Sequence, residues 1–195
     1  LSLGGVFLET REVKQADLAG IAGIENAANV AAVGPMVLGG VEINGRRAML
    51  AGVDFETSLI LKPWWKVEGR YPQEEGLVLG SEAARLLNLK TGQSASLNQT
   101  SIPISGVLAA TGSQDDGLIF APLGLAQRLL NKPGLISMAE VAALCGDCPV
   151  QEMVSQIGKV LPGAKVTAIS QVVKGRMETI GNLERIGLSL SLAVM

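Results

Sequence analysis

The sequence contains no histidine, and aromatic residues make up only 3% of its 195 residues. The chain therefore lacks the side chain that most often acts as a base near neutral pH and that most often binds zinc. Few aromatic rings also means few platforms on which nucleobases or sugars could stack. With 16 basic and 18 acidic residues the net charge is −2, and no basic stripe is present. We therefore expect no nucleic-acid partner.

Nucleotide-binding motifs are also missing. The sequence has no G-x-x-x-x-G-K-[ST], and no G-x-G-x-x-G lies between a predicted strand and a predicted helix, so no phosphate cradle is expected. Serine-based hydrolysis lacks its histidine partner. We therefore predict no catalytic residue, no cofactor-binding residue and no metal ligand.

The apolar content is high. Hydrophobic residues make up 48% of the chain, charged residues 17%, and the length suits one large domain or two small ones. The first residue is Leu1 and no signal peptide follows, so we expect a leading segment to have been removed. Residues 186–195, IGLSLSLAVM, carry no charge but are too few to cross a bilayer, which takes about 20 apolar residues. We interpret them as the start of a truncated transmembrane helix, with a terminal core helix as the alternative.

Residues 76–112 give the clearest local pattern. An apolar run at 77–80 predicts a buried strand, and Ser81 occupies an N-cap position before a helix that Gly92 would end. Two alternating stretches, 94–97 and 102–108, predict a hairpin.

The first quarter predicts a strand at residues 5–9, a helix at 13–24 and a buried strand at 29–38. Asn44-Gly45 then lies between two apolar stretches, which is the strongest short-range signal for a hairpin.

Residues 54–72 are irregular and contain Trp64 and Trp65. We expect one ring to close the core and the other to be half exposed. A ligand shelf or a membrane-interface anchor is the alternative.

Asp115 and Asp116 could be considered as a metal pair, but no third or fourth oxygen ligand recurs nearby, so we predict a turn. A strand at 118–122 and a helix at 123–130 follow, with Gln127 and Arg128 expected to face solvent.

The last third predicts a strand at 135–144, a helix from 149 to about 160 and a strand at 164–169. A final helix from Gln171 would run into the apolar tail. Since this order repeats that of the first quarter, we expect an α+β fold with two βαβ-type halves split by a central β-rich lobe.

Cys145 and Cys148 are the two cysteines, in a C-x-x-C at a predicted strand-to-helix junction. We predict a structural disulfide, which would close a short loop and act as a local clip. A free thiol pair remains an alternative, as does a redox or metal role. Against the redox role, Leu144 stands where an aromatic residue is usual; against a metal, two sulfurs without histidine cannot fill a tetrahedral site.

Four stretches together resemble a known family: GVDFETSLILKPWWKVEGRYP (52–72), LVLGSEAARLLNLKTGQ (77–93), IPISGVL (102–108) and DDGLIFAPLGLAQRLL (115–130). In order and spacing they are similar to the extracytoplasmic domain of MacB-like (FtsX-like) ABC transporter permeases. The resemblance implies a non-catalytic domain on the periplasmic or extracellular side of the bacterial cytoplasmic membrane, anchored by flanking transmembrane helices. It further implies that the domain transmits motion, with ATP hydrolysed on a separate subunit or removed segment.

The resemblance also implies partners and a division of the chain. The partners are an ATP-binding subunit, a second permease copy and, as a further candidate, a periplasmic adaptor protein. Residues 1–53 and 134–185 would form a porter-like subdomain, residues 54–133 a central β-rich subdomain, and 186–195 the truncated membrane helix. Two other hypotheses are a free-standing extracytoplasmic solute-binding domain and a thiol–disulfide oxidoreductase.

Overall fold

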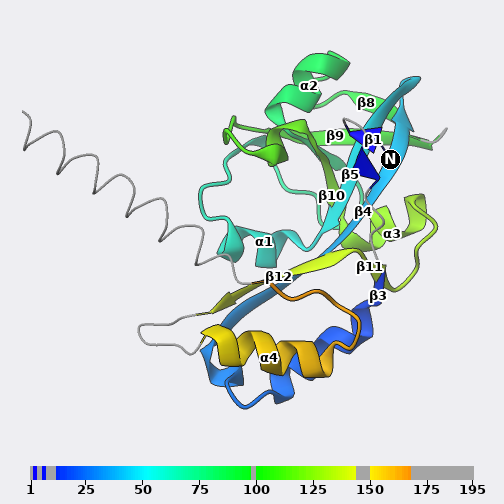
Figure 1. The fold of residues 1–195 in the computed structure, drawn as a ribbon. Helices are drawn as coiled ribbons and strands as arrows, with labels where there is room; N and C mark the ends of the chain where they lie inside the picture. Colours follow the sequence, from blue (N-terminus) through cyan, green and yellow to red (C-terminus); the bar gives the residue numbers. More distant parts are fainter. Residues whose placement is uncertain (1, 4–5, 8–11, 98–99, 144–149, 168–195) are drawn as a thin grey trace, which may run out of the picture. The chain divides into compact units, whose positions relative to one another are not determined.

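The computed structural model describes residues 2–3, 6–7, 12–97, 100–143 and 150–167. The chain divides into two units, Leu1–Cys148 and Pro149–Met195, and each is described by itself. The first unit contains these elements: β1 (Ser2–Leu3), β2 (Val6–Phe7), β3 (Val13–Lys14), η1 (Gln15–Gly23), η2 (Ala27–Asn29), β4 (Val30–Ile43), β5 (Arg46–Val53), α1 (Phe55–Leu61), β6 (Val67–Gly69), β7 (Leu77–Leu79), α2 (Ser81–Leu87), β8 (Ser94–Leu97), β9 (Thr100–Leu108), η3 (Gln114–Gly117), β10 (Ile119–Pro122), α3 (Leu123–Leu129), β11 (Leu135–Ile136) and β12 (Met138–Ala143) (Figure 1). The second unit contains α4 (Val150–Val160), which confirms the helix predicted from 149 to about 160 over its described residues.

One mixed sheet organises the first unit. Its strand order is β12-β4-β5-β10-β7-β9-β6, and β8 pairs with β9 and, at one residue, with β4. β10 pairs in parallel with β5 and antiparallel with β7, while β7 pairs in parallel with β9. Mixed helices and strands confirm the α+β class, whereas the division at residues 53 and 134 stays a prediction.

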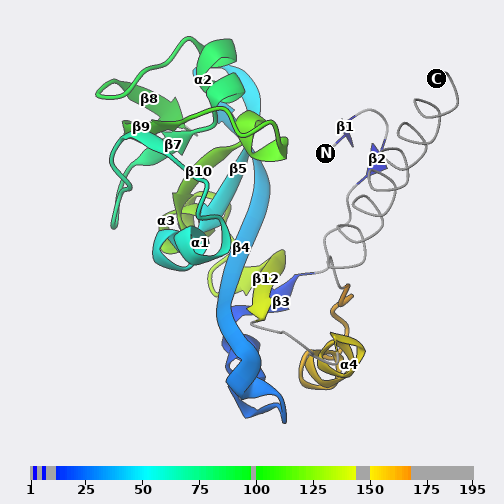
Figure 2. The same ribbon diagram turned by 90° about the vertical axis from the view of Figure 1, so that its left-hand side faces the viewer.

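Strand β4 is the longest element among the described residues, and in Figure 2 it runs along the first unit. Its second half forms the predicted hairpin with β5, and the turn residues Asn44 and Gly45 both have positive φ, at 48° and 77°. This matches the two-residue turn in which both central residues need a left-handed backbone. The hairpin prediction is confirmed.

The central strands are buried on both faces. On β7, Leu77 and Leu79 belong to one apolar cluster and Val78 to the other. Because successive side chains on a strand point to opposite faces, the two clusters lie on opposite sides of the sheet. Residues of α2 and α3 pack into the first cluster, and Phe55 of α1 packs into the second. Burial of both faces explains why the strand sequences are continuous apolar runs rather than alternating ones.

The helix predicted at residues 13–24 is confirmed over residues 15–23, where it is a 3-10 helix, but not at residues 13–14. β3 comes first, and residues 15–23 then form a 3-10 helix. Leu18, Ile21 and Ile24 are spaced three apart, which is the period of a 3-10 helix and only approximately that of an α-helix.

The ends of α2 also differ from the prediction. Gly80 is the N-cap and Ser81 is the first helical residue, with its hydroxyl bonded to Asp116 instead of to the helix amides. Asn88, at φ 54°, caps the C-terminus, so the helix ends before Gly92, which takes a positive φ in the next turn. Asparagine tolerates this left-handed conformation better than most residues.

Two further predictions are wrong, and a third is confirmed in part. Gln127 is buried, because its amide donates to Gln15 Oε1 at 2.9 Å and to the Leu135 carbonyl at 3.0 Å. The strand predicted at 135–144 is confirmed at 135–136 and 138–143, but it is divided at Ser137, whose hydroxyl accepts a hydrogen bond from Leu38 N at 2.9 Å. Residues 164–167, the described part of the strand predicted at 164–169, form no strand. The final helix predicted from residue 171 lies outside the described residues.

Candidate functional site

The two neighbouring tryptophans have opposite environments. Trp65 is 4% exposed and packs edge-on against Phe120 with ring centroids 4.8 Å apart, whereas Trp64 is 58% exposed. One ring therefore closes the second apolar cluster and the other faces solvent, which confirms the sequence prediction.

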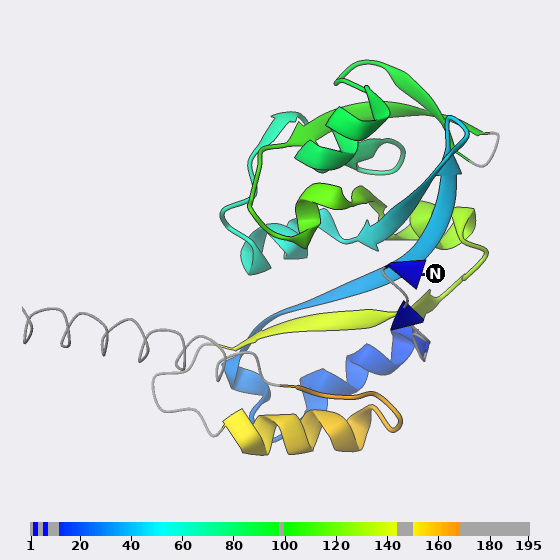
Figure 3. The same ribbon diagram turned by 45° about the horizontal axis from the view of Figure 1, so that its top comes forward.

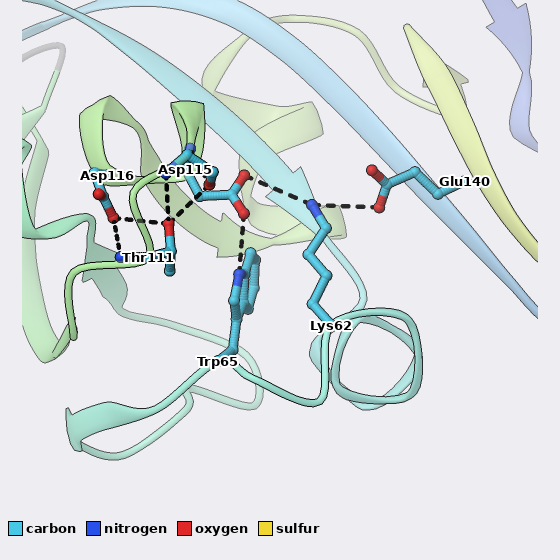
Figure 4. Close-up of polar contacts among 7 residues, drawn as sticks. Lys62, Trp65, Thr111, Asp115, Asp116 and Glu140 are labelled. Atoms are coloured by element: carbon cyan, nitrogen blue, oxygen red, sulfur yellow. Dashed lines mark hydrogen bonds and ion pairs between the residues drawn. The ribbon is translucent and has the colours of Figure 1, made fainter. Parts of the chain in front are cut away.

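Lys62, immediately after α1, gathers partners from distant parts of the first unit. Its ammonium lies 3.6 Å from Asp115 Oδ1 in η3 and 3.3 Å from Glu140 Oε2 in β12 (Figure 4). It also lies 5.1 Å from the centroid of the Trp65 ring, and Trp65 Nε1 donates to Asp115 Oδ2 at 3.0 Å. We call these four residues the Lys62 cluster. The side chains of Lys62 and Asp115 are 12% and 15% exposed, so these interactions are screened less than those of an ordinary surface pair.

Asp116 lies beside this cluster but faces another set of donors. Its carboxylate accepts hydrogen bonds from Thr111 N (2.8 Å), Thr111 Oγ1 (2.9 Å) and Gly112 N (2.9 Å), and another from the Ser81 hydroxyl. The backbone hydrogen bond from Thr111 is the largest cause that holds the pKa of Asp116 below its ordinary value, and it outweighs the opposing effect of burial. The carboxylate ties the loop at 111–116 to the start of α2.

Neither aspartate is placed as a metal ligand. Each has hydrogen-bond or ion-pair partners within the protein, and no group of three or more His, Cys, Asp or Glu that could hold a metal occurs in the part of the chain that the structure describes. The predicted turn at these residues is the 3-10 turn η3, with the Ser113 hydroxyl accepting from Asp115 N at 3.2 Å. The arrangement offers ion pairs and hydrogen bonds that join α1, η3, β12 and the start of α2.

Gly80 allows α2 and η3 to approach closely. A Cβ at this position would meet the carbonyl oxygens of Asp115 and Asp116, and backbone atoms cannot swing aside as a flexible side chain can. We expect Gly80→Ala to lower the free energy of unfolding by roughly 1–3 kcal/mol, in the range of overpacking substitutions. Gly117→Ala, in the same turn, meets no atom within 4 Å and should cost less than about 1 kcal/mol. Urea unfolding of both variants checks this, and equal losses would contradict it.

Cys145 and Cys148, the predicted disulfide, lie outside the described residues, so their pairing stays a prediction. Sequence inspection did not identify the Lys62 cluster as a site. Lys62 and Glu140 are single charges in otherwise apolar stretches, and only the fold brings them together. A single charge inside an otherwise apolar stretch is the signal that could have pointed to each of them.

In the described ranges, no helix has the length and apolar content needed to cross a membrane.

The family of MacB-like periplasmic core domains matches residues 5–176. No curated protein sequence matches the chain at a significant level. Among solved structures, the chain is similar to the periplasmic region of MacB from Actinobacillus actinomycetemcomitans, with a TM-score of 0.63 and 14% identity over 85% of this chain and 83% of that one. It is also similar to the extracellular domain of the noncanonical ABC-type transporter YknZ from Gram-positive bacteria, with a TM-score of 0.62 and 13% identity over 77% of this chain and 82% of that one.

At these identities the two structures show the shared fold, and the family match covers most of the chain. The chain therefore belongs to the family of MacB-like periplasmic core domains, the extracytoplasmic domains of MacB-like ABC transporter permeases, as the sequence resemblance predicts.

Proposed function

We propose that this domain couples ATP-driven motion of membrane helices to the export or extraction of cargo. The family match over residues 5–176 is the observation that supports the proposal, because the family is that of MacB-like periplasmic core domains. The family is that of a transporter periplasmic domain, generally non-catalytic. ATP hydrolysis would take place on a separate subunit or on another segment of the parent protein.

The partners we propose are an ATP-binding subunit, a second copy of the permease and a periplasmic adaptor protein. Flanking transmembrane helices would anchor the domain, the second of them starting near residues 186–195. Residues 1–53 with 134–185 would form one subdomain and residues 54–133 the other. Cys145 and Cys148 would form a structural disulfide.

The continuous sheet of the first unit supports a role in transmitting motion, since strand β4 runs without a break from its pairing with β12 to its pairing with β5.

The experiment uses the full-length permease with its ATP-binding subunit in lipid nanodiscs. Leu86, 58% exposed on α2, is replaced by cysteine and spin-labelled in a background in which Cys145 and Cys148 are serine. We expect pulsed electron–electron double resonance to show that the distance between the spin labels on the two copies changes when ATP and vanadate are added.

A hydrolysis- and binding-deficient ATP-binding subunit is the control and should leave the distance unchanged. A distance that stays constant while ATP is hydrolysed would contradict the coupling. If, instead, a small solute added without nucleotide raised the melting temperature of the domain, the solute-binding hypothesis would take its place.

A further inference from the structure

The first half of β4 forms a two-stranded ribbon with β12. Within the described pairings, β4 residues 30–35 pair with β12 alone, and β5 joins only from Met36 onward. Pro35 lies in this stretch and has no backbone N–H with which to bond a neighbouring strand. Its position is compatible with the sheet because the described pairing of β4 with β5 starts only at the next residue. A two-stranded ribbon is marginally stable by itself in water, so packing against other elements has to support it. We call residues 30–35 with 139–143 the β4–β12 ribbon.

Helix α1 follows β5 directly and packs against the β4–β12 ribbon. β5 ends at Val53, Asp54 caps the helix by accepting a hydrogen bond from Thr57 N at 3.0 Å, and α1 then contacts both strands of the ribbon. Figure 3 shows β12 running beside the first part of β4.

Leu61, the last residue of α1, packs against the ribbon at Gly34, where no side chain is present. A Cβ at Gly34 would meet Leu61 Cδ1, and it would also lie 3.7 Å from Thr57 Cγ2. Gly34 does not have a positive φ, so the structure uses glycine here for space and not for backbone freedom. Leu61 therefore occupies the volume that any other residue at this position would fill.

The next residue, Lys62, adds an electrostatic tie at the same place. Glu140 pairs in the ladder with Gly34, so Leu61 and Lys62 contact the two opposed residues of one ribbon pair. On its other side Lys62 meets Asp115, which Trp65 Nε1 fixes to the core. One ammonium thus stands between a carboxylate on the ribbon and a carboxylate on the body of the sheet. Without Lys62, no ion pair would connect Glu140 on the ribbon with Asp115 on the body of the sheet.

We infer that Leu61 and Lys62, at the end of α1, form a latch that fixes the β4–β12 ribbon to the body of the sheet, and that loss of the Lys62 ion pairs frees the ribbon to move. The latch is a property of the first unit and does not depend on the proposed transport function. The contact of Leu61 with Gly34 positions the ribbon. The ion pairs of Lys62 make the strength of this attachment depend on the charges of Lys62, Asp115 and Glu140. Salt should weaken the contact of Lys62 with Glu140, which is 29% exposed, more than the contact with the less exposed Asp115. Going from about 0.1 M to about 1 M salt shortens the Debye length from about 10 Å to about 3 Å.

The test is hydrogen exchange measured by mass spectrometry on the 195-residue chain. In Lys62→Met, exchange at residues 30–35 and 139–143 should speed up by about tenfold or more, while β7 and β10 keep the wild-type rates. Glu140→Gln should act in the same direction but less strongly, since Lys62 keeps Asp115. Lys66→Met, which removes an exposed cation from the same loop, is the matched control and should change none of these rates.

A salt titration gives a second readout. After correction for intrinsic exchange, about 1 M NaCl should speed exchange in the wild-type ribbon and have little effect in Lys62→Met. If Lys62→Met fails to fold, Glu140→Gln and the wild-type salt titration carry the test. Unchanged ribbon exchange in the variants would overturn the inference, and so would a rise of equal size in β7 and β10.

Discussion

Replacing Trp65 with alanine is expected to lower the free energy of unfolding by about 3–5 kcal/mol, the usual cost of removing a large aromatic side chain from a packed core. Trp65 is 4% exposed, packs edge-on against Phe120 and donates to Asp115. Its removal would leave a cavity in the second apolar cluster. It would also remove the hydrogen bond from Trp65 Nε1 that orients the Asp115 carboxylate.

Trp64 provides a matched control one residue away. Because it is 58% exposed, Trp64→Ala should change the free energy of unfolding by less than about 1 kcal/mol. Urea unfolding followed by circular dichroism compares the two variants without relying on tryptophan fluorescence. Similar losses in both would show that the burial of Trp65 does not contribute as we argue.

Asp116→Ala is expected to destabilise the protein by about 3 kcal/mol, because hydrogen bonds to a charged group contribute about 1.5–3 kcal/mol each and are not additive. The substitution leaves the amides of Thr111 and Gly112 without their acceptor and removes the tie to Ser81. We expect faster hydrogen exchange at the two amides and a lower urea midpoint. Ser113→Ala, in the same loop, keeps the Asp116 carboxylate; it removes the hydroxyl that accepts from Asp115 N and that is hydrogen-bonded to Thr111 Oγ1, and it should cost about 1 kcal/mol. An Asp116→Ala variant as stable as the wild type would contradict the role of this carboxylate.

The same carboxylate predicts a pH dependence. Its pKa in the folded protein is below the ordinary value of 3.8, so its contribution to stability is fully present above that value and is lost as the pH falls through the folded-state pKa. Wild-type stability should therefore fall as the pH is lowered from about 5 toward 3, and the fall should be smaller in Asp116→Asn. Urea midpoints measured at several pH values in both proteins check this. Equal slopes would show that other carboxylates account for the acid sensitivity.

The sequence predicts local features of the fold well where a residue type decides the backbone. Asn44-Gly45 supplies the two positive φ values that a tight hairpin needs, and the turn forms where this pair predicts it. The apolar run at β7 also predicts its strand correctly. Three consecutive apolar residues fit a strand that is covered on both faces, and all three are buried. The family resemblance added the transporter class, which no residue pattern alone could supply.

Features that depend on distant contacts were not predicted. Gln127 looks like a solvent-facing position on an amphipathic helix, yet its amide partner Gln15 is 112 residues away. Periodicity also cannot show that β10 lies between β5 and β7, because pairing partners leave no trace in the hydrophobic pattern of a strand buried on both sides. The Lys62 cluster escaped detection because its members come from three separate segments, around residues 62–65, 115 and 140.

The place of β10 in the sheet has a consequence for how the domain assembles as it is synthesised. β5 and β7 do not pair with each other, and β10, at residues 119–122, joins the β4–β5 hairpin to the layer of β7, β9 and β6. Before that strand emerges, a single residue pair, Ile43 with Leu97, is the only described ladder contact between the two pieces. The nascent chain should thus hold two incomplete β layers with open edges until about residue 122 is free. Over this interval the exposed edges would be most prone to pairing with other chains and most in need of a chaperone.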